Sequence, residues 1–551
     1  MIPITAGNKS VTAALFTILL AGLMIRICDI DFGLPSLYDP DEPIFVLRAL
    51  KILRDRDLNP GWFGHPGTTT IYMLSMMYAL IYAVGRMLGI FSDAGGFADY
   101  IRADSSLLYL SGRLLILVFA IASLYVIFVI GRRIFGRWVG ILGAALLAIS
   151  PVHVHYSQLI RTDVQLGFLA LLTVLFSLRI SEYGRWRDYA LAGVMIGLSI
   201  ATKWPGVVLL LVVIAAHYSS VRLSKQRLDE AFSKLLLAGA LALLSLFLVS
   251  PFIFLDFATV LQDVARESHT NHLSANGHGF LGNLWWYLTV PIVSSTSGVG
   301  LLLALFGIAY SCYRDTRHSV VLLAFPLAFI LFIPALALRW ERWIVPILPF
   351  VGLYAAAGIF ALAKVGGSMV HRYSREAAVV SGVLLTMAIA IPLASNIKAR
   401  ATELRNDTRA ATGAWLLKNI PKGSRLLMEA YTPQLPLGTY EFFGVTGGGS
   451  IERAGVSSWN PFQPIGQLGN LKEFGELRRQ HIDYLVLSNW FERYTAEAAL
   501  YPEAVMNYRA IFANSTEIYR IDPLSGRMGG PTIRVLEVPT DSGSVTPRPR
   551  Q

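Results

Sequence analysis

Long apolar runs separated by short polar connections make up the chain as far as Asn396. A helix needs about 20 apolar residues to cross the hydrocarbon core of a bilayer, and many of these runs reach that length. The pattern therefore predicts an α-helical polytopic membrane protein. The first run is VTAALFTILLAGLMIRI from Val11, and the others start near Leu107, Val139, Val164, Tyr189, Val207, Leu235, Trp285, Val320, Trp343 and Ala377.

One further apolar segment, TTTIYMLSMMYALIYAVGRMLGIF from Thr68, disturbs the alternation of the loops. If it crossed the membrane, the acidic stretch YDPDEP at Tyr38 would face the side opposite to RTD at Arg161. We therefore expect residues 68–91 to form a juxtamembrane or re-entrant segment. This leaves about 11 spans by the 20-residue criterion, with juxtamembrane helices beside them.

The loops between the runs fall into two sets by charge. The basic loops are GRRIFGRW from Gly131, EYGRWRD from Glu182, VRLSKQR from Val221, YRDTRH from Tyr313 and HRYSRE from His371. The loops with isolated acids and histidines start at His153, Asp256 and Arg339. Because Lys and Arg accumulate in cytoplasmic loops, the first set is expected inside and the second outside the plasma (inner) membrane. The N-terminus is then cytoplasmic and the C-terminal part extracytoplasmic.

The hydropathy falls after the last run, and the pattern changes to that of a soluble α/β domain. ELRNDTRAATGAWLLKNI has helical periodicity and stops at Pro421. SRLLMEAY, IDYLVLSN and PTIRVLEV are short β-rich runs bounded by turn residues. We expect a membrane domain over 1–395, an extracytoplasmic α/β domain over 396–540 and a disordered tail over 541–551.

The composition excludes several classes of protein. Of the 551 residues, 54% are hydrophobic and 15% are charged, which no soluble globule combines. The net charge of +11 is explained mostly by the basic loops, so it indicates topology and no nucleic-acid partner. The two cysteines, Cys28 and Cys312, lie near the ends of apolar segments, so a disulfide framework is not expected.

The sequence contains no motif for binding a nucleotide. It has no Walker loop, no strand-associated G-x-G-x-x-G and no Cys/His zinc spacing. An active site outside the membrane has no nucleotide supply, so its chemistry needs an activated donor delivered through the membrane. A sugar linked to a polyprenyl phosphate meets that need as a co-substrate.

The stretch YDPDEPIFVLRALKIL, from Tyr38, places several carboxylates before an amphipathic helix. In one interpretation Asp41 is an N-cap, Pro43 lies in the first turn and Glu42 complements the helix dipole. In the other, this is the catalytic end of an enzyme that acts on a lipid-borne substrate. The two interpretations are compatible, because a cap holds a carboxylate rigidly.

Five motifs in order resemble landmarks of the GT-C-type glycosyltransferases. They are DPDEPIFVLRALKIL, HPGTTTIYML at His65, SQLIRTDVQLGFLALLTVL at Ser157, IATKWPGVVLLL at Ile200 and ERWIVPILPFVGLYAA at Glu341. The similarity is to the protein O-mannosyltransferase and aminoarabinose-transferase-like superfamily. It implies a multispanning enzyme that moves a sugar from a polyprenyl-phosphate donor to a lipid, glycan or protein acceptor outside the membrane.

The resemblance also implies roles for single residues. Asp41 matches the general base, Glu42 its acidic neighbour, and Asp163 a second carboxylate that orients the acceptor or the sugar. Lys203 matches a lysine near the donor phosphate. Arg339, Glu341 and Arg342 match a charged outer loop, and His65 replaces a lysine that many relatives carry before the prolines.

These roles agree with the chemistry of a single inverting displacement. The leaving lipid phosphate needs fixed cations, for which Lys203, Arg339, Arg342 and His65 are candidates. The acceptor hydroxyl loses a proton as it attacks, so a carboxylate base must lie within hydrogen-bond reach. The alternatives are that Lys203 snorkels from a span end and that the 339–342 loop is an interfacial ion-pair network.

The loop ESHTNHLSANGHGF contains His269, His272 and His278. These histidines could bind a metal, but the loop lacks a structural-zinc pattern, so no metal site is assigned and a divalent cation stays an open question. We expect the three histidines to line the entrance for the acceptor or donor.

The main rival class is a transporter or flippase of lipid-linked sugars. It predicts ionisable residues near the middle of the bilayer and repeated, broken spans. Here the charges gather at one face and repeats are not evident, which favours an enzyme. A noncatalytic scaffold that binds glycans is a third possibility, and in that case replacing Asp41 would leave function intact. The donor sugar and the acceptor are not determined by these patterns.

Overall fold

The computed structural model describes residues 6–224, 228–268, 270–369, 374–436, 438–446, 448–453 and 467–539. His269 and the tail expected over 541–551 lie outside the described residues. The chain divides into two compact units. The helical unit comprises Met1–Ile30, Ile44–Ile90 and Leu108–Ile397, and the sheet unit comprises Asp31–Pro43, Phe91–Leu107 and Lys398–Gln551. The sheet unit therefore includes two segments that hydropathy assigned to the membrane domain.

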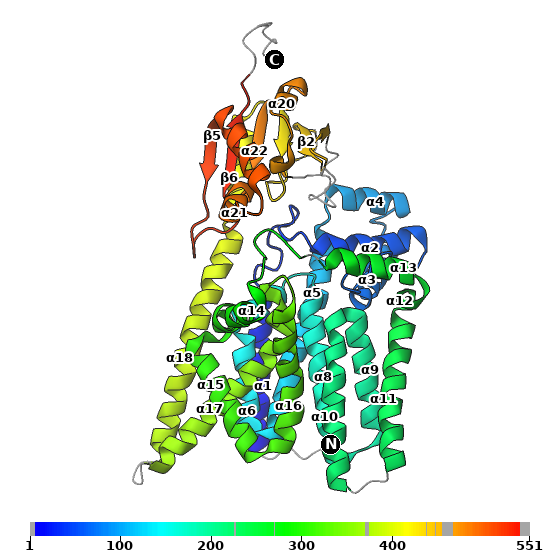
Figure 1. The fold of residues 1–551 in the computed structure, drawn as a ribbon, viewed down its shortest axis with the longest axis vertical. Coiled ribbons are helices and arrows are strands. Elements are labelled where there is room, and N and C mark those ends of the chain that lie inside the picture. The colour runs from blue at the N-terminus through cyan, green and yellow to red at the C-terminus, as the bar shows by residue number, and fades with distance from the viewer. Residues whose placement is uncertain are drawn as a thin grey trace. The chain divides into compact units, whose positions relative to one another are not determined.

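Helices along one common axis build the helical unit (Figure 1). They are α1 (Ala6–Ile27), α5 (Ser106–Ile134), α6 (Arg137–Ala148), α8 (Thr162–Tyr183), α9 (Trp186–Thr202), α10 (Leu210–Ser224), α11 (Leu228–Val249), α15 (Val293–Arg314), α16 (Thr316–Phe332), α17 (Leu348–Met369) and α18 (Ser374–Arg405). In the described part of the chain, 10 helices are long and apolar enough to cross a membrane. The predicted α-helical polytopic fold is confirmed.

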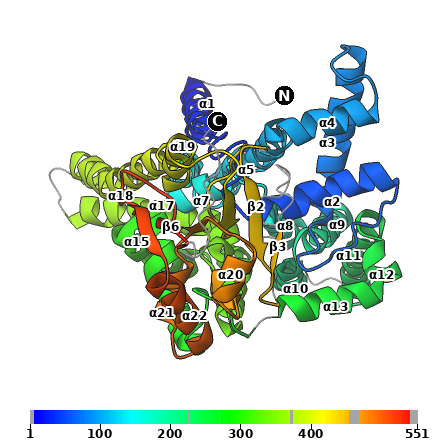
Figure 2. The same ribbon diagram turned by 90° about the horizontal axis from the view of Figure 1, so that it is seen from above.

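The helix α3 (Thr68–Met87) satisfies the length and composition of a span but runs across the bundle axis, as the two views show (Figures 1 and 2). This orientation agrees with the juxtamembrane placement expected for residues 68–91. Two further helices, α2 (Glu42–Asp55) and α13 (Phe257–Glu267), lie at the same end of the bundle.

Small residues allow the long helices to pack closely. A Cβ atom added at Gly307 of α15 would lie 2.0 Å from the carbonyl oxygen of Tyr354 in α17, so these helices touch backbone to backbone. Gly193 of α9 has the same relation to Ala238 of α11, at 2.3 Å. Close backbone contact at glycine is typical of helix pairs in membranes. These contacts fix the frame from which the polar loops project.

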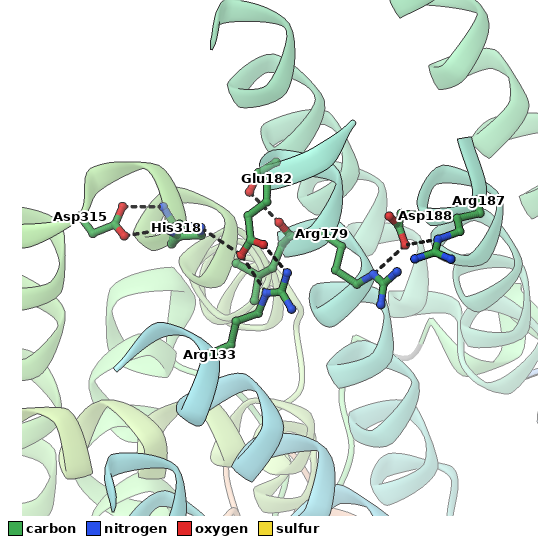
Figure 3. Close-up of polar contacts among 9 residues, drawn as sticks. Arg133, Arg179, Glu182, Arg187, Asp188, Asp315 and His318 are labelled. Atoms are coloured by element: carbon green, nitrogen blue, oxygen red, sulfur yellow. Dashed lines mark hydrogen bonds and ion pairs between the residues drawn. The ribbon is translucent and has the colours of Figure 1, made fainter. Parts of the chain in front are cut away.

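At one end of the helical unit, Glu182 joins three elements (Figure 3). It accepts a hydrogen bond from Arg133 of α5, and its carboxylate lies 3.3 Å from Nε2 of His318 in α16. The other ring nitrogen of His318 lies 2.6 Å from Asp315. The cluster therefore ties the ends of α5, α8 and α16 together with paired charges.

The sheet unit contains a six-stranded sheet in the order β3-β2-β1-β4-β6-β5. Its strands are β1 (Arg425–Met428), β2 (Glu441–Val445), β3 (Ile451–Arg453), β4 (Tyr484–Leu487), β5 (Thr516–Ile521) and β6 (Ile533–Glu537). β2, β1 and β4 are parallel, and the remaining pairs are antiparallel. The three β-rich runs recognised in the sequence form β1, β4 and β6.

The helices of the sheet unit are α4 (Ala94–Ala103), α19 (Thr408–Asn419), α20 (Gly475–Arg479), α21 (Trp490–Ala496) and α22 (Pro502–Ala513). The helical stretch expected before Pro421 is split, because α18 ends at Arg405 and α19 begins at Thr408. Asp407 separates them as the N-cap of α19, and its side chain accepts a hydrogen bond from the backbone N–H of Arg409.

Candidate active site

The centre of the candidate site is an ion pair between Asp163 and Lys203. Asp163 lies in the first turn of α8, and Lys203 is the extended residue that ends α9. Pro205 follows two residues later and prevents the helix from continuing unchanged. Nζ of Lys203 donates to Oδ1 of Asp163 at 2.5 Å, and only 8% and 3% of the two side chains are exposed. Both charges are therefore held in a position that water scarcely reaches.

Further cations surround this pair. Besides Asp163, the groups that act electrostatically on Lys203 include Arg342 and Arg161. His65 is close to the same cluster. Burial lowers its pKa below the ordinary histidine value, and the positive charges of Lys203 and Arg342 lower it further. Several positively charged groups therefore act on Lys203 and His65, besides the buried carboxylate of Asp163.

Glu267 opposes the effect of the cations on His65. Its carboxylate at the end of α13 lies 3.6 Å from Nε2 of His65 and raises the pKa of the imidazole, but burial outweighs it. The ring of Trp62 packs edge-on against His65, with centroids 5.4 Å apart. His65 therefore carries a positive charge only below its lowered pKa.

A buried network of hydroxyls fastens the loop that carries His65. The backbone N–H of Gly67 donates to the carbonyl of Thr202 at 3.2 Å. The hydroxyls of Thr69 and Thr202 are 2.7 Å apart. Gln165 of α8 donates to Thr69 at 3.0 Å and accepts from Thr70 at 2.6 Å. Gln165 and the threonines were not predicted as site residues, although the run TTT after HPG was a visible signal.

Two acidic residues outside the predicted set hold the same loop from the other side. Oδ2 of Asp263 in α13 accepts from the backbone N–H of Phe63 at 2.8 Å. Asp256 accepts from the side chain of Asn59 at 3.0 Å. Hydrogen bonds from Asn59 and Thr259 keep the pKa of Asp256 below its usual range. The loop before α3 is therefore anchored at both of its ends.

The structure brings Arg339 and His278 together. Nη2 of Arg339 lies 3.2 Å from Nε2 of His278, and its guanidinium lies 5.0 Å from the ring centre of Trp286. The backbone N–H of Arg339 donates to the carbonyl of Ala275 at 2.9 Å. Short backbone pairing thus joins the histidine loop to the 339–342 loop.

Trp340 connects Arg342 with His272. The guanidinium of Arg342 lies 5.0 Å from the ring centre of Trp340, within the range of a cation–π contact. The ring of His272 packs edge-on against the same indole at 5.0 Å. Two of the three predicted loop histidines therefore meet the arginine loop, and His269 lies outside the described residues.

The histidines do not assemble a metal site within the part of the chain that the structure describes. There, no group of three or more His, Cys, Asp or Glu side chains is arranged to hold a metal ion. Glu341 of the same loop instead accepts a hydrogen bond from the hydroxyl of Tyr156 at 3.4 Å.

Asp41, the predicted general base, belongs to the sheet unit. Asp41 directly precedes α2, and Glu42 is the first residue of that helix. Oδ1 of Asp39 accepts from the backbone N–H of Asp41 at 3.0 Å, and Glu42 is fully buried. That Asp41 shares one pocket with Asp163 and Lys203 stays a prediction.

Comparison with known proteins adds to this geometry. The family model described as dolichyl-phosphate-mannose-protein mannosyltransferase matches residues 106–254. No curated protein sequence matches the chain significantly. Among solved structures, ArnT from Cupriavidus metallidurans in the apo state is 12% identical with a TM-score of 0.54, covering 97% of this chain and 98% of that chain. The fold is that of the GT-C-type glycosyltransferases.

Other GT-C structures are similar to a comparable degree. ArnT bound to undecaprenyl phosphate is 13% identical with a TM-score of 0.52, covering 96% of this chain and 98% of that chain. The oligosaccharyltransferase AglB from Archaeoglobus fulgidus, in complex with an inhibitory peptide and a dolichol-phosphate, is 13% identical with a TM-score of 0.52. It covers 94% of this chain and 74% of that chain. The resemblance recognised in the sequence is confirmed at the level of the fold.

The segment matched by the family model contains only part of the candidate GT-C site. Asp163 and Lys203 lie within residues 106–254. His65 and the 339–342 loop lie outside it, as does Asp41. The buried ion pair of Asp163 and Lys203 therefore lies within the matched segment.

Proposed function

We propose that this protein transfers a sugar from a polyprenyl-phosphate donor to a hydroxyl group of a lipid, glycan or protein on the extracytoplasmic side of the membrane. The observation that carries the proposal is the buried ion pair of Lys203 and Asp163, on which Arg342 and Arg161 also act electrostatically. It lies at one end of membrane-spanning helices, where the phosphate of a lipid would reach it. Preorganised cations stabilise the charge that develops on a leaving phosphate.

The proposed reaction is one displacement at the anomeric carbon. The acceptor oxygen forms a bond to that carbon while the bond from carbon to the phosphate oxygen breaks. Asp41 receives the proton of the acceptor hydroxyl, and the polyprenyl phosphate leaves with the bonding electrons. Configuration at the carbon is inverted, because no covalent enzyme intermediate forms.

The geometry suggests a narrower role for Asp163 than the resemblance implied. Its carboxylate pairs with Lys203 at 2.5 Å, so it would hold the lysine in place and offset part of the positive charge there. Arg339 and Arg342 would border the phosphate, and His65 would donate a hydrogen bond to it. His272 and His278 would support that loop.

The solved structures support the donor class. ArnT has been seen with undecaprenyl phosphate, and AglB with a dolichol-phosphate. Nothing in these similarities favours the transporter alternative. The identity of the sugar, hexose or pentose, and of the acceptor would be found by mass spectrometry of lipids and envelope glycans from cells with and without the gene.

Asp41→Asn tests the assigned base. The variant keeps the shape of the side chain but accepts no proton, so transfer in purified membranes should fall at least about 1000-fold. Binding of the polyprenyl-phosphate donor, measured on the same preparation, should be unchanged. Transfer at the wild-type rate by Asp41→Asn would refute the mechanism.

A further inference from the structure

A cation–π clamp holds the chain just before the proposed base. The guanidinium of Arg409 lies 3.6 Å from the centre of the Tyr38 ring, and Nη1 donates to the Tyr38 carbonyl at 3.3 Å. Asp407 orients Arg409 through two hydrogen bonds, of 2.8 Å to Nε and 2.7 Å to Nη2. The side chains of Arg409 and Asp407 are only 11% and 5% exposed. All three residues belong to the sheet unit.

The covalent path from this clamp to Asp41 is short and stiff. Only Asp39 and Pro40 separate Tyr38 from Asp41. The ring of Pro40 locks its φ angle. The side chain of Asp39 closes a turn by accepting the backbone N–H of Asp41 at 3.0 Å. A displacement of Tyr38 would therefore be transmitted to the carboxylate of Asp41.

We infer that Arg409 is a positioning residue for transfer, which clamps Tyr38 and thereby holds the base Asp41 in its reactive place. The inference rests on the proposed function, and it assigns to the C-terminal sheet unit a part in catalysis. Arg409 acts through Tyr38 and does not touch the substrate.

Tyr38 itself does not serve as an alternative base. Burial and the nearby carboxylate of Asp407 raise the pKa of its hydroxyl to about 12, although Arg409 opposes them. The hydroxyl therefore stays protonated at neutral pH. Its ring and its carbonyl are what Arg409 holds.

The clamp is tested by steady-state kinetics of full-length protein with the polyprenyl-phosphate sugar donor found for the wild type. Arg409→Ala and Tyr38→Ala should each lower kcat about 10- to 100-fold, because a catalytic group misplaced by an ångström loses that much rate. The KM for the donor should change less than about twofold, because the phosphate-binding residues are untouched. The double variant should be no slower than the slower single variant.

Two further variants separate positioning from a purely structural contribution. Tyr38→Phe retains the ring and the carbonyl and should recover most of the rate lost in Tyr38→Ala. Arg425→Ala is the matched control, because Arg425 also pairs with a carboxylate, Glu441 at 3.2 Å, and lies 5.7 Å from the ring of Phe443. Arg425→Ala should leave kcat unchanged whatever it does to thermal stability.

The outcomes are distinguishable from those that test the proposed function. If the wild type transfers no sugar from any polyprenyl-phosphate donor, the proposed function fails. If the wild type is active and both Arg409→Ala and Tyr38→Ala keep the wild-type kcat, the clamp is refuted while the function stands. Additive losses in the double variant, or an equal loss in Arg425→Ala, would also overturn the clamp.

Discussion

The two ends of α8 carry acidic residues that serve different purposes. Asp163 at its beginning and Glu182 near its end are about 30 Å apart along the helix, at 1.5 Å per residue. Glu182 pairs with Arg133 and faces His318, which in turn pairs with Asp315. Each cation there meets a carboxylate, as in Figure 3.

A neighbouring cluster at the Glu182 end places two arginines against one carboxylate. Arg179 donates to Asp188 at 2.7 Å, and Arg187 lies 3.9 Å from the same carboxylate (Figure 3). At the other end, Arg342 and Arg161 act electrostatically on Lys203, as does the carboxylate of Asp163. The cations at the two ends differ in burial, because 28% of the Arg179 and 61% of the Arg187 side chain are exposed but only 8% of the Lys203 side chain. The comparison therefore contrasts a cluster that joins helices with one that we propose binds the donor phosphate.

Removing one basic side chain from each of the two clusters should test the comparison most clearly. Lys203→Ala should lower the transfer rate at least about 100-fold, because a fixed cation at the leaving phosphate is lost. Arg133→Ala, the matched change at the Glu182 end, should leave the rate within about threefold of the wild type, because it contacts no substrate. The measurement is sugar transfer in membranes with equal amounts of each protein.

An equal loss of transfer in Lys203→Ala and Arg133→Ala would contradict the proposal that only the Asp163 end of α8 binds the donor. Lys203→Arg serves as the control for charge. It retains a cation, so it should recover part of the rate if the loss in Lys203→Ala reflects phosphate binding.

Glu429 in the sheet unit offers a contrast to Asp163. It is also buried, but its hydrogen-bond partners are backbone N–H groups and a tyrosine hydroxyl in place of a cation. It accepts from the backbone N–H groups of Leu468 and Ser488 at 3.1 and 2.9 Å, and from the hydroxyl of Tyr508. Burial outweighs these bonds and raises its pKa to about 7. Asp163, by contrast, has Lys203 to compensate its charge.

The raised pKa makes the stability of the sheet unit depend on pH. Glu429 binds its proton more tightly in the folded protein than in the unfolded chain. The stabilisation from this proton is therefore fully present below the pKa that Glu429 has in the unfolded chain, and it is lost as the pH rises to about 7. The free energy of unfolding should be about 3 kcal/mol higher at pH 4.5 than at pH 8. Glu429→Gln should remove this slope.

Hydrogen exchange of the β1 and β4 peptides in the full-length protein measures this effect, after correction for the intrinsic pH dependence of exchange. Greater protection at pH 8 than at pH 5 in the wild type would show that the sign is wrong. An unchanged slope in Glu429→Gln would assign the dependence to another group.

The smallest effect is expected for Glu182→Gln. Loss of the carboxylate charge weakens its bonds to Arg133 and His318, which should lower the free energy of unfolding by about 1 to 2 kcal/mol. The kcat for transfer should stay unchanged. Thermal unfolding in detergent and a transfer assay on the same sample measure both quantities, and a selective loss of kcat would place Glu182 in the catalytic machinery.

The residues of the site were predictable to different extents. The resemblance to GT-C motifs pointed to Lys203, Asp163 and Arg342, and their part in transfer stays a prediction. The hydroxyl network of Gln165 and the threonines could not be found in this way, because such residues are common in helices and only their partners distinguish them. The pairing of Arg409 with Tyr38 joins residues 371 positions apart, beyond any local pattern.

The order of apolar runs and the charge of their connections determined the membrane fold by themselves, because crossing a bilayer requires long apolar helices whatever their neighbours are. The tertiary structure alone decided that Lys203 pairs with Asp163 and that Arg409 holds Tyr38. These outcomes depend on which polar groups meet after the helices pack, and a buried charge is stable only with the partner that packing supplies.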